Sequence, residues 1–271
     1  MLIADKLFNG DTLDTREVGI EIEVEGENLP QNTPMGWRRE HDGSLRGESA
    51  EYVLRKPIPR AKVEMMLDRL ISKFDSSQVF DTGRAGVHIH INIRDLTEVQ
   101  LYNFICLYLV FEDTLVDYCG EARVGNLFCL RAKDAEYLLE LVEAAAIESD
   151  LRILHTDAIR YASINCKAIC EYGSLEFRAM RSTVDKEVLL GWTGMLLRLK
   201  DMSKMFTDPR DIVSTMSWEG GEEFAKKIFG EILSYFPANT DWELCVLEGI
   251  RQAQTIAYAG NWKEKENVVP F

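Results

Sequence analysis

Residues 16–25 read REVGIEIEVE, a stretch in which apolar side chains alternate strictly with acidic or small ones. The apolar positions are Val18, Ile20, Ile22 and Val24. This period of two predicts a β-strand, because successive side chains of a strand point to opposite faces. One face of the strand is therefore apolar, and the other carries Glu21 and Glu23.

A second alternating segment at 86–93, GVHIHINI, places His88 and His90 on one face of another strand. Shorter strands are predicted at 51–54, 161–168 and 172–180. Their polar positions include Glu51, Asn165, Glu176 and Arg178. If these strands are neighbours, one face of the sheet gathers carboxylates and imidazoles, and the apolar face packs on helices.

Helical periodicity dominates the remaining sequence. Apolar residues recur at helical spacing in the segments 60–74, 97–118, 134–149, 184–205, 220–235 and 241–258. Thr97 and Gln100 predict a capping box at the start of the second segment. Strands come early and helices cluster late, which predicts an α+β fold with an antiparallel sheet. We expect one domain over 1–271, with a strand-rich core at 16–180 and a helical part at about 184–260.

Composition narrows the class of protein. The 271 residues carry a net charge of −14, which disfavours general nucleic-acid binding because phosphate backbones are repelled. The six cysteines form no CxxC pair and several lie in apolar helical patterns, which indicates buried thiols in a reducing, cytoplasmic compartment. No apolar run approaches the length of a membrane span, and the N-terminus shows no signal-peptide pattern.

Each polar pair on the strands has a plain structural explanation when it is taken alone. Glu21 and Glu23 could form a solvated face, the two histidines a structural pair, and Glu176 with Arg178 a same-face ion pair. The combination is harder to explain in this way, because several carboxylates held together repel one another. A divalent cation removes that cost, and mostly oxygen ligands with one or two imidazoles suit Mg²⁺ or Mn²⁺.

Arginines near these positions indicate a phosphate group. Arg178 and Arg181 follow Glu176 closely, and Arg123 lies in a separate segment. Planar guanidinium groups can grip phosphoryl oxygens, although an ordinary surface position explains Arg123 and Arg181 equally well. The sequence has no P-loop, no convincing GxGxxG and no GxSxG elbow, which disfavours the common nucleotide-binding and serine-hydrolase sites.

The loop HDGSL at 41–45 predicts a turn by its Asp-Gly-Ser composition. Asp42 either serves only this turn, or reaches the metal or an incoming amine.

Taken in order, several of these segments resemble the phage and bacterial amidoligase family. The matching pieces are GIEIEVE at 19–25, HDGSL at 41–45, EYVLRKP at 51–57, GVHIHINI at 86–93, RVGNLFCL at 123–130, RYASINC at 160–166 and YGSLEFRAMRST at 172–183. They run through about the first two thirds of the chain, and residues 206–271 match no functional motif.

The resemblance implies a carboxylate–amine ligase with a glutamine-synthetase-like fold, whose curved antiparallel sheet has a polar catalytic face and helices on the other. Such an enzyme uses ATP and Mg²⁺ or Mn²⁺ to convert a carboxylate into an acyl phosphate, which an amine then attacks to form an amide or isopeptide bond. The expected partners are a small-molecule or peptide carboxylate and an amine, with a homo-oligomer as a further expectation. The enzyme would act in the cytoplasm, that of the host if a phage encodes it.

The resemblance also implies roles for the strand residues. Glu21, His88 and Glu176 would hold one metal ion, and Glu23 and Glu51 would hold a second.

The remaining candidates would serve the nucleotide and the substrates. By the same resemblance, Arg178 would bind the transferring phosphate, and Arg123 and Arg181 would assist with nucleotide or acyl phosphate. Asn165 and His90 would lie at the cofactor, with His90 either toward the substrate or behind the metal ligands. Asp42 would orient or deprotonate the amine.

Two other functions remain open at this point. The same polar face could serve a metal-dependent hydrolase that needs no ATP, or a protein that binds a metal or ligand without catalysis. Dependence on ATP separates the three. The identities of both substrates, a modified nucleobase among the possible amines, are not readable from the sequence.

Overall fold

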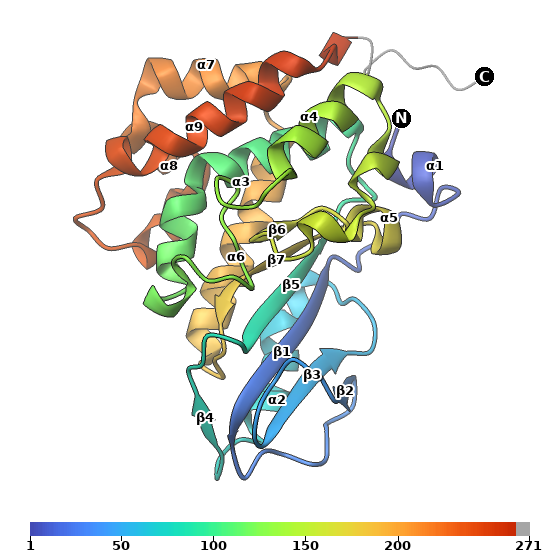
Figure 1. The fold of residues 1–271 in the computed structure, drawn as a ribbon, viewed down its shortest axis with the longest axis vertical. Helices are drawn as coiled ribbons and strands as arrows, with labels where there is room; N and C mark the ends of the chain where they lie inside the picture. Colours follow the sequence, from blue (N-terminus) through green and yellow to red (C-terminus); the bar gives the residue numbers. More distant parts are fainter. Residues whose placement is uncertain (264–271) are drawn as a thin grey trace.

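The computed structural model describes residues 1–263, which form an open seven-stranded sheet with helices packed on it (Figure 1). The strands are β1 (Val18–Glu27), β2 (Trp37–Glu40), β3 (Ser49–Leu54), β4 (Gln78–Phe80), β5 (Gly86–Asn92), β6 (Ile164–Asn165) and β7 (Ser174–Arg181). Their order is β2-β3-β1-β5-β7-β6, β4 also pairs with β1, and every strand pairing is antiparallel. The predicted α+β class with an antiparallel sheet is confirmed.

The helices are α1 (Ile3–Leu7), α2 (Val63–Ile71), α3 (Glu98–Tyr118), α4 (Leu138–Glu148), α5 (Ala168–Tyr172), α6 (Lys186–Ser203), α7 (Pro209–Glu219), α8 (Gly221–Phe229) and α9 (Trp242–Ala259). All six predicted helical segments contain a helix, although 220–235 continues as a 3₁₀-helix after α8. The predicted capping box of α3 is present, with Thr97 accepting from the Gln100 amide. The sequence reading missed the short strands β2 and β4 and the helices α1, α5 and α7.

The strand predicted at 161–168 is mostly wrong. Only Ile164 and Asn165 pair with β7, and residues 168–172 wind into α5 instead. Gly173 ends that helix in the left-handed conformation, with a φ of 69°. A residue with a side chain adopts this conformation only at an energetic cost. The chain can therefore turn sharply from α5 into β7.

The alternation of β1, β5 and β7 separates an apolar and a polar face as expected. The side chains of the apolar face are at most 1% exposed, and they are Ile20, Ile22, Val24, Val87, Ile89, Ile91, Leu175 and Phe177. They belong to one hydrophobic cluster that continues through the helices. The helices thus cover the apolar face and leave the polar face for other uses.

Helix α3 is the central helix of the core, and α6 and α9 pack beside it (Figure 1). It is 21 residues long and apolar enough to span a membrane by length and composition, so the expectation that no run approaches that length is wrong. The apolar window of α3 is 89% buried inside the structure. Protein, rather than lipid, therefore covers this helix.

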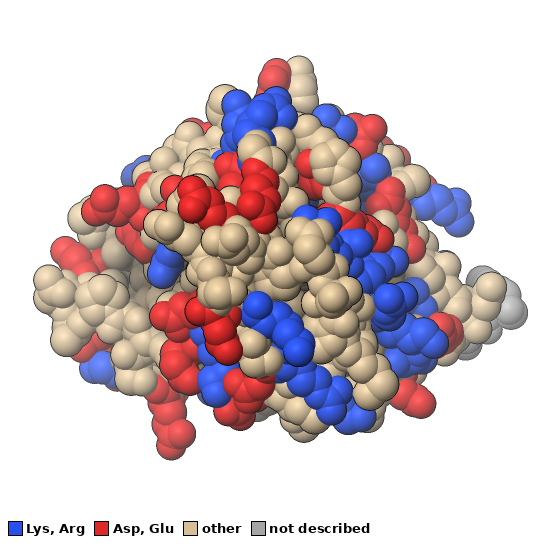
Figure 2. Space-filling view, turned by 90° about the horizontal axis from the view of Figure 1, so that it is seen from below, with Lys and Arg blue, Asp and Glu red and all other residues tan. Residues whose placement is uncertain are grey.

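Charges of both signs lie side by side on the end of the molecule that Figure 2 shows. The net charge of −14 is therefore not spread evenly over the surface. Local clusters of arginine and lysine can attract an anion even though the whole protein is acidic.

We predict that Gly249→Ala destabilises the fold. A Cβ at Gly249 in α9 would lie 2.1 Å from the Leu109 carbonyl oxygen of α3, so the two helices would have to move apart. Such overpacking costs about 1–3 kcal/mol, and the thermal unfolding midpoint should fall. Gly194→Ala in α6 is the matched control, because nothing lies within 4 Å of its Cβ position. An equal or smaller loss for Gly249→Ala would contradict the close packing of α3 and α9.

Candidate active site

Three neighbouring strands bring Glu21, His88 and Glu176 together on the polar face. Glu21 on β1 is the register partner of His88 on β5, and Glu176 lies on β7, the next strand. His88 Nδ1 lies 3.3 Å from Glu21 Oε2 and 3.7 Å from Glu176 Oε1. One possible ligand atom from each residue lies within 4.8 Å of the others, which is close enough for a common ion. The donor set, two carboxylates and one imidazole, fits a divalent cation.

Two more glutamates extend this cluster along β1 and onto β3. Glu23 Oε1 lies 3.8 Å from His88 Nε2, and Glu23 Oε2 accepts from the Gly86 amide at 3.0 Å. Glu51 is the cross-strand partner of Glu23. We call the five residues Glu21, Glu23, Glu51, His88 and Glu176 the carboxylate cluster.

The environment separates the pKa values of these carboxyl groups. Burial, followed by repulsion from Glu21 and Glu23, raises the pKa of Glu51 to about 8. Burial also works to raise the pKa of Glu21, but the hydrogen bonds of His88 and His90 hold it well below its usual range. The cluster therefore holds ionised carboxylates beside one carboxyl group that resists ionisation. A bound cation would lower the electrostatic energy of this arrangement.

Arg178 and Asn165 hold Glu176 in place. Arg178 Nη1 donates to Glu176 Oε1 and lies 3.5 Å from His88 Nδ1. Asn165 Nδ2 donates to Glu176 Oε2 at 2.7 Å, which gives this amide an orienting role. The Arg178 Nε atom is buried and has no hydrogen-bond partner among the described residues. The guanidinium group thus keeps donor capacity beside the cluster.

An irregularity in the β5–β7 pairing positions Arg178. Ile89 pairs with Phe177 and Val87 pairs with Met180, so two residues of β7 lie opposite His88. Those residues are Arg178 and Ala179. Such bulges re-aim side chains and occur often beside active sites. Here the bulge keeps Phe177 and Met180 on the helix side while Glu176 and Arg178 remain on the polar face.

His90 and Asp42 lie at opposite sides of the cluster. His90 Nε2 is 3.5 Å from Glu21 Oε1, and its Nδ1 is 3.0 Å from Ser174 Oγ. Asp42 caps its own loop by accepting from the Ser44 amide at 2.6 Å. Burial works to raise the pKa of Asp42, but the Ser44 hydrogen bonds and contact with Glu23 lower it overall. Asp42 is therefore an ionised carboxylate within reach of the cluster.

Arg123 is buried, with 1% of its surface exposed, and it holds the backbone together. Its three guanidinium nitrogens donate to the carbonyl oxygens of Ala179, Ala85 and Arg178 at 2.8–3.2 Å. It also lines the cavity beside Arg178. Its expected contact with nucleotide or acyl phosphate stays a prediction, and the structure adds a role in supporting β7.

Arg181 lies outside the cluster. Its Nη1 donates to the Cys119 carbonyl oxygen at 3.2 Å, and it lines a separate hollow with Asp81 and Asp185. No described contact joins it to Glu176 or Arg178, so the structure does not bring it together with the other candidates.

Two cavities flank the cluster on the polar face. The first, of about 300 Å³, contains Glu23, Asp42, His88, Asn165 and Arg178, and we call it the cationic cavity. Further basic and aromatic residues line it, and sequence reasoning assigned them no role: Arg84, Phe128, Arg160, Tyr161 and Lys167. All five lie in loops or turns of the structure, including Tyr161 and Lys167, for which a strand was expected.

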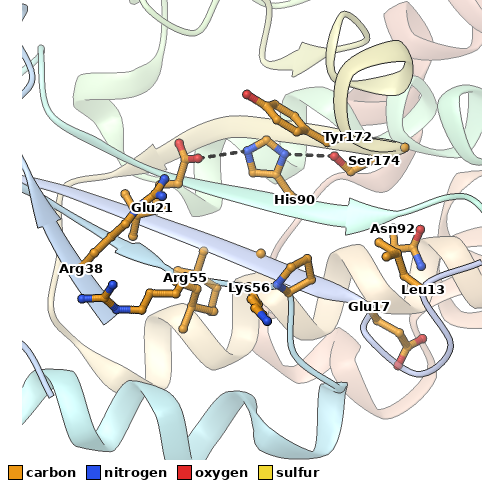
Figure 3. Close-up of a pocket in the computed structure, with 16 residues that line it drawn as sticks. Leu13, Glu17, Glu21, Arg38, Arg55, Lys56, His90, Asn92, Tyr172 and Ser174 are labelled. Atoms are coloured by element: carbon orange, nitrogen blue, oxygen red, sulfur yellow. Dashed lines mark hydrogen bonds and ion pairs between the residues drawn. The ribbon is translucent and has the colours of Figure 1, made fainter. Parts of the chain in front are cut away.

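The second cavity, of about 240 Å³, lies at the other end of the cluster and contains Glu21 and His90 (Figure 3). We call it the β3-side cavity, because Val53 to Pro57 form one of its walls. Tyr172 and Ser174 stand on the opposite wall beside His90 (Figure 3). A cation held by the cluster would therefore be reachable from two sides.

Comparison with protein families identifies the family of this chain. A family model described as "Putative amidoligase enzyme" matches residues 57–199, more than half of the chain. The chain belongs to this amidoligase family. No curated protein matches the chain. The matched range contains His88, His90, Glu176 and Arg178, whereas Glu21 precedes it.

We predict that Glu176→Gln removes metal binding at the cluster. In the unaltered protein, Mg²⁺ or Mn²⁺ should raise the thermal midpoint, because a ligand that binds only the folded state stabilises it. The variant should lose most of that rise. Glu112→Gln is the matched control, since Glu112 is equally buried but bonds Ala132 and Ser163 away from the cluster. A full metal-dependent rise in Glu176→Gln would remove this residue from the ligand set.

A second prediction concerns Glu51→Gln in protein freed of metal with a chelator. The folded-state pKa of about 8 lies above the ordinary value of 4.5, so the stability that the protonated carboxyl contributes is lost as pH rises through 8. Glutamine stays neutral and escapes this loss. The loss begins near pH 4.5 and is complete near pH 8, so the amount by which the variant's unfolding temperature exceeds that of the unaltered protein should be larger at pH 9 than at pH 6. A difference that is the same at both pH values would argue against repulsion at Glu51.

Proposed function

We propose that this amidoligase joins a carboxylate to an amine with ATP and Mg²⁺ or Mn²⁺, through an acyl phosphate. The observation that carries the proposal is a carboxylate cluster with Arg178 at its edge and a cavity on either side. A ligase of this kind must bring three reactants to one point, and two cavities that meet at one cation site supply that access. The proposal includes the glutamine-synthetase-like fold that the resemblance implies for this chain.

The cationic cavity suits a nucleotide. Arg84 and Arg160 line it, and neither has a carboxylate within ion-pair distance among residues 1–263. Phe128 and Tyr161 meet edge to face at 5.9 Å between ring centroids, which supplies aromatic surface for a base. Guanidinium groups near the cluster can hold the phosphates, and the rings can contact the adenine.

The cluster residues fit a divalent cation, with Glu21, His88 and Glu176 as one ligand set and Glu23 and Glu51 as a second. When bound, the cation would neutralise and orient the phosphate oxygens of ATP. Arg178, fixed by Glu176, would donate to the transferring phosphoryl group as charge develops on its oxygens.

Two covalent steps follow from this arrangement. A carboxylate oxygen attacks the γ-phosphorus, the bond to the β-phosphate oxygen breaks, and ADP leaves. The amine nitrogen then attacks the acyl carbon, and phosphate leaves with the bonding electron pair. Asp42 is ionised, so it attracts and orients the amine, and it accepts the proton once the attacking nitrogen has become acidic.

The experiment that tests this function uses hydroxylamine as a small amine, because it converts acyl phosphates into hydroxamates. ADP and hydroxamate should form together only when ATP, Mg²⁺ and a carboxylate, such as glutarate or L-glutamate, are all present. Arg178→Lys should bind ATP but lose most turnover, because an ammonium cannot reproduce the bidentate contact. Arg131→Lys is the control, since Arg131 pairs with Asp113 outside both cavities.

Two outcomes would contradict the proposal. Turnover of esters or phosphoesters without nucleotide would indicate a metal-dependent hydrolase. Metal binding with no turnover of ATP and any of these carboxylates would indicate a binding protein. Unchanged turnover in Arg178→Lys would remove Arg178 from the mechanism.

A further inference from the structure

In the β3-side cavity the carboxylates have partners of opposite charge or imidazole partners, whereas two of the cations have no carboxylate partner among the described residues. Two carboxylates line it, and both have cationic or imidazole partners. Glu17 accepts two guanidinium hydrogen bonds from Arg60 at 2.8 Å, and Glu21 contacts His88 and His90. The acidic side of the balance is therefore already satisfied within the protein.

The basic side of the same cavity is not satisfied. Arg38 pairs with Glu40 at 2.8 Å, but Arg55 and Lys56 have no carboxylate within ion-pair distance in the described part of the chain. In Figure 3 all three residues lie below His90 and Tyr172; Arg38 extends toward Glu21, whereas Arg55 and Lys56 extend in different directions. Two unpaired cations in a cavity of a protein with a net charge of −14 indicate a site for an anion.

Arg55 is held in position for such a contact. Its Nε donates to the Trp37 carbonyl oxygen at 3.0 Å, and its amide donates to the Gly36 carbonyl oxygen at 2.9 Å. One edge of the guanidinium group is thereby fixed, and its two terminal nitrogens remain for a ligand. A guanidinium group that is already oriented loses less side-chain entropy when it binds a planar carboxylate.

Apolar atoms make up most of the lining of the cavity. Gly19 forms part of the floor, and a Cβ there would lie 3.2 Å from His90 Cβ, which is tighter than ordinary contact. Val53, Leu54 and Pro57 supply apolar wall. A short aliphatic chain can therefore lie between the cluster at Glu21 and the cations at Arg55 and Lys56.

We infer that the β3-side cavity binds the carboxylate substrate of the proposed ligase, and that this substrate carries a second carboxylate held by Arg55 and Lys56. The substrate class is thus a dicarboxylate, such as an acidic amino acid or the acidic end of a peptide. The inference rests on the proposed function for the fate of the first carboxylate, which lies at the cluster. Binding of the second carboxylate is a property of the cavity alone.

Direct binding tests the inference without turnover. Glutarate is titrated calorimetrically into the full chain in Mg²⁺ buffer. Two analogues are titrated beside it: valerate, in which a methyl group replaces one carboxylate, and cadaverine, in which aminomethyl groups replace both. Glutarate should bind at least about tenfold more tightly than valerate, because a charge-assisted contact is lost. Cadaverine should not compete with glutarate.

Two variants locate the contact. Arg55→Gln and Lys56→Gln should each weaken glutarate binding about tenfold and leave valerate binding unchanged. Lys62→Gln is the matched control, because Lys62 is an exposed lysine outside both cavities, and it should bind glutarate as the unaltered protein does. Melting temperatures of all three variants should stay near the original, since these side chains are exposed.

The outcomes separate this inference from the proposed function. If glutarate binding depends on Arg55 and Lys56 but no ADP is released, the dicarboxylate site is supported and the proposed ligase function is contradicted. If ADP is released and the KM for glutarate is unchanged in both variants, the ligase function is supported and the inference of a second-carboxylate site is overturned. Equal binding of valerate, no binding of glutarate, or tighter binding of cadaverine would overturn it as well.

Discussion

The repulsion between carboxylates on the polar face is the constraint on which the site depends. Antiparallel pairing holds Glu21, Glu23 and Glu51 on adjacent strands, where they cannot move apart without breaking the sheet. Arg178 offsets part of the charge, whereas burial, together with repulsion from Glu21 and Glu23, raises the pKa of Glu51. A divalent cation would balance such a face, which is the physical basis of the metal site proposed above.

The helical layer stabilises the sheet that carries this polar face. The apolar sides of the same strands are at most 1% exposed and join a hydrophobic cluster centred on α3. Burial of that face stabilises the sheet enough to tolerate unfavourable charge on the other. The bulge at Arg178 and Ala179 then aims one guanidinium group at the cluster without disturbing the core.

The site is assembled from two stretches of chain: one lies inside the range that the family model matches, and the other precedes it. The family match over 57–199 includes β5 and β7 with His88 and Glu176, and it ends before the outer helices α7–α9. Glu21, Asp42 and Glu51 come before it and complete the cluster through β1, β3 and one loop. The two cavities differ in the same way. Loops after residue 57 supply most cations of one, whereas β2 and the two residues directly after β3 supply those of the other.

The sequence by itself determined the strands that alternate, the face on which Glu21, His88 and Glu176 stand, and the long helices, because a period of two or 3.6 is a local property of the chain. It could not determine the short elements, such as the two-residue β6 in place of a strand at 161–168, because two residues carry no period. Only the tertiary structure decided that Arg123 supports backbone carbonyls, that Arg181 stands apart, and that Arg55 and Lys56 share a cavity with His90. Those facts depend on strand order and loop paths, which bring together residues far apart along the chain and leave no local pattern in it.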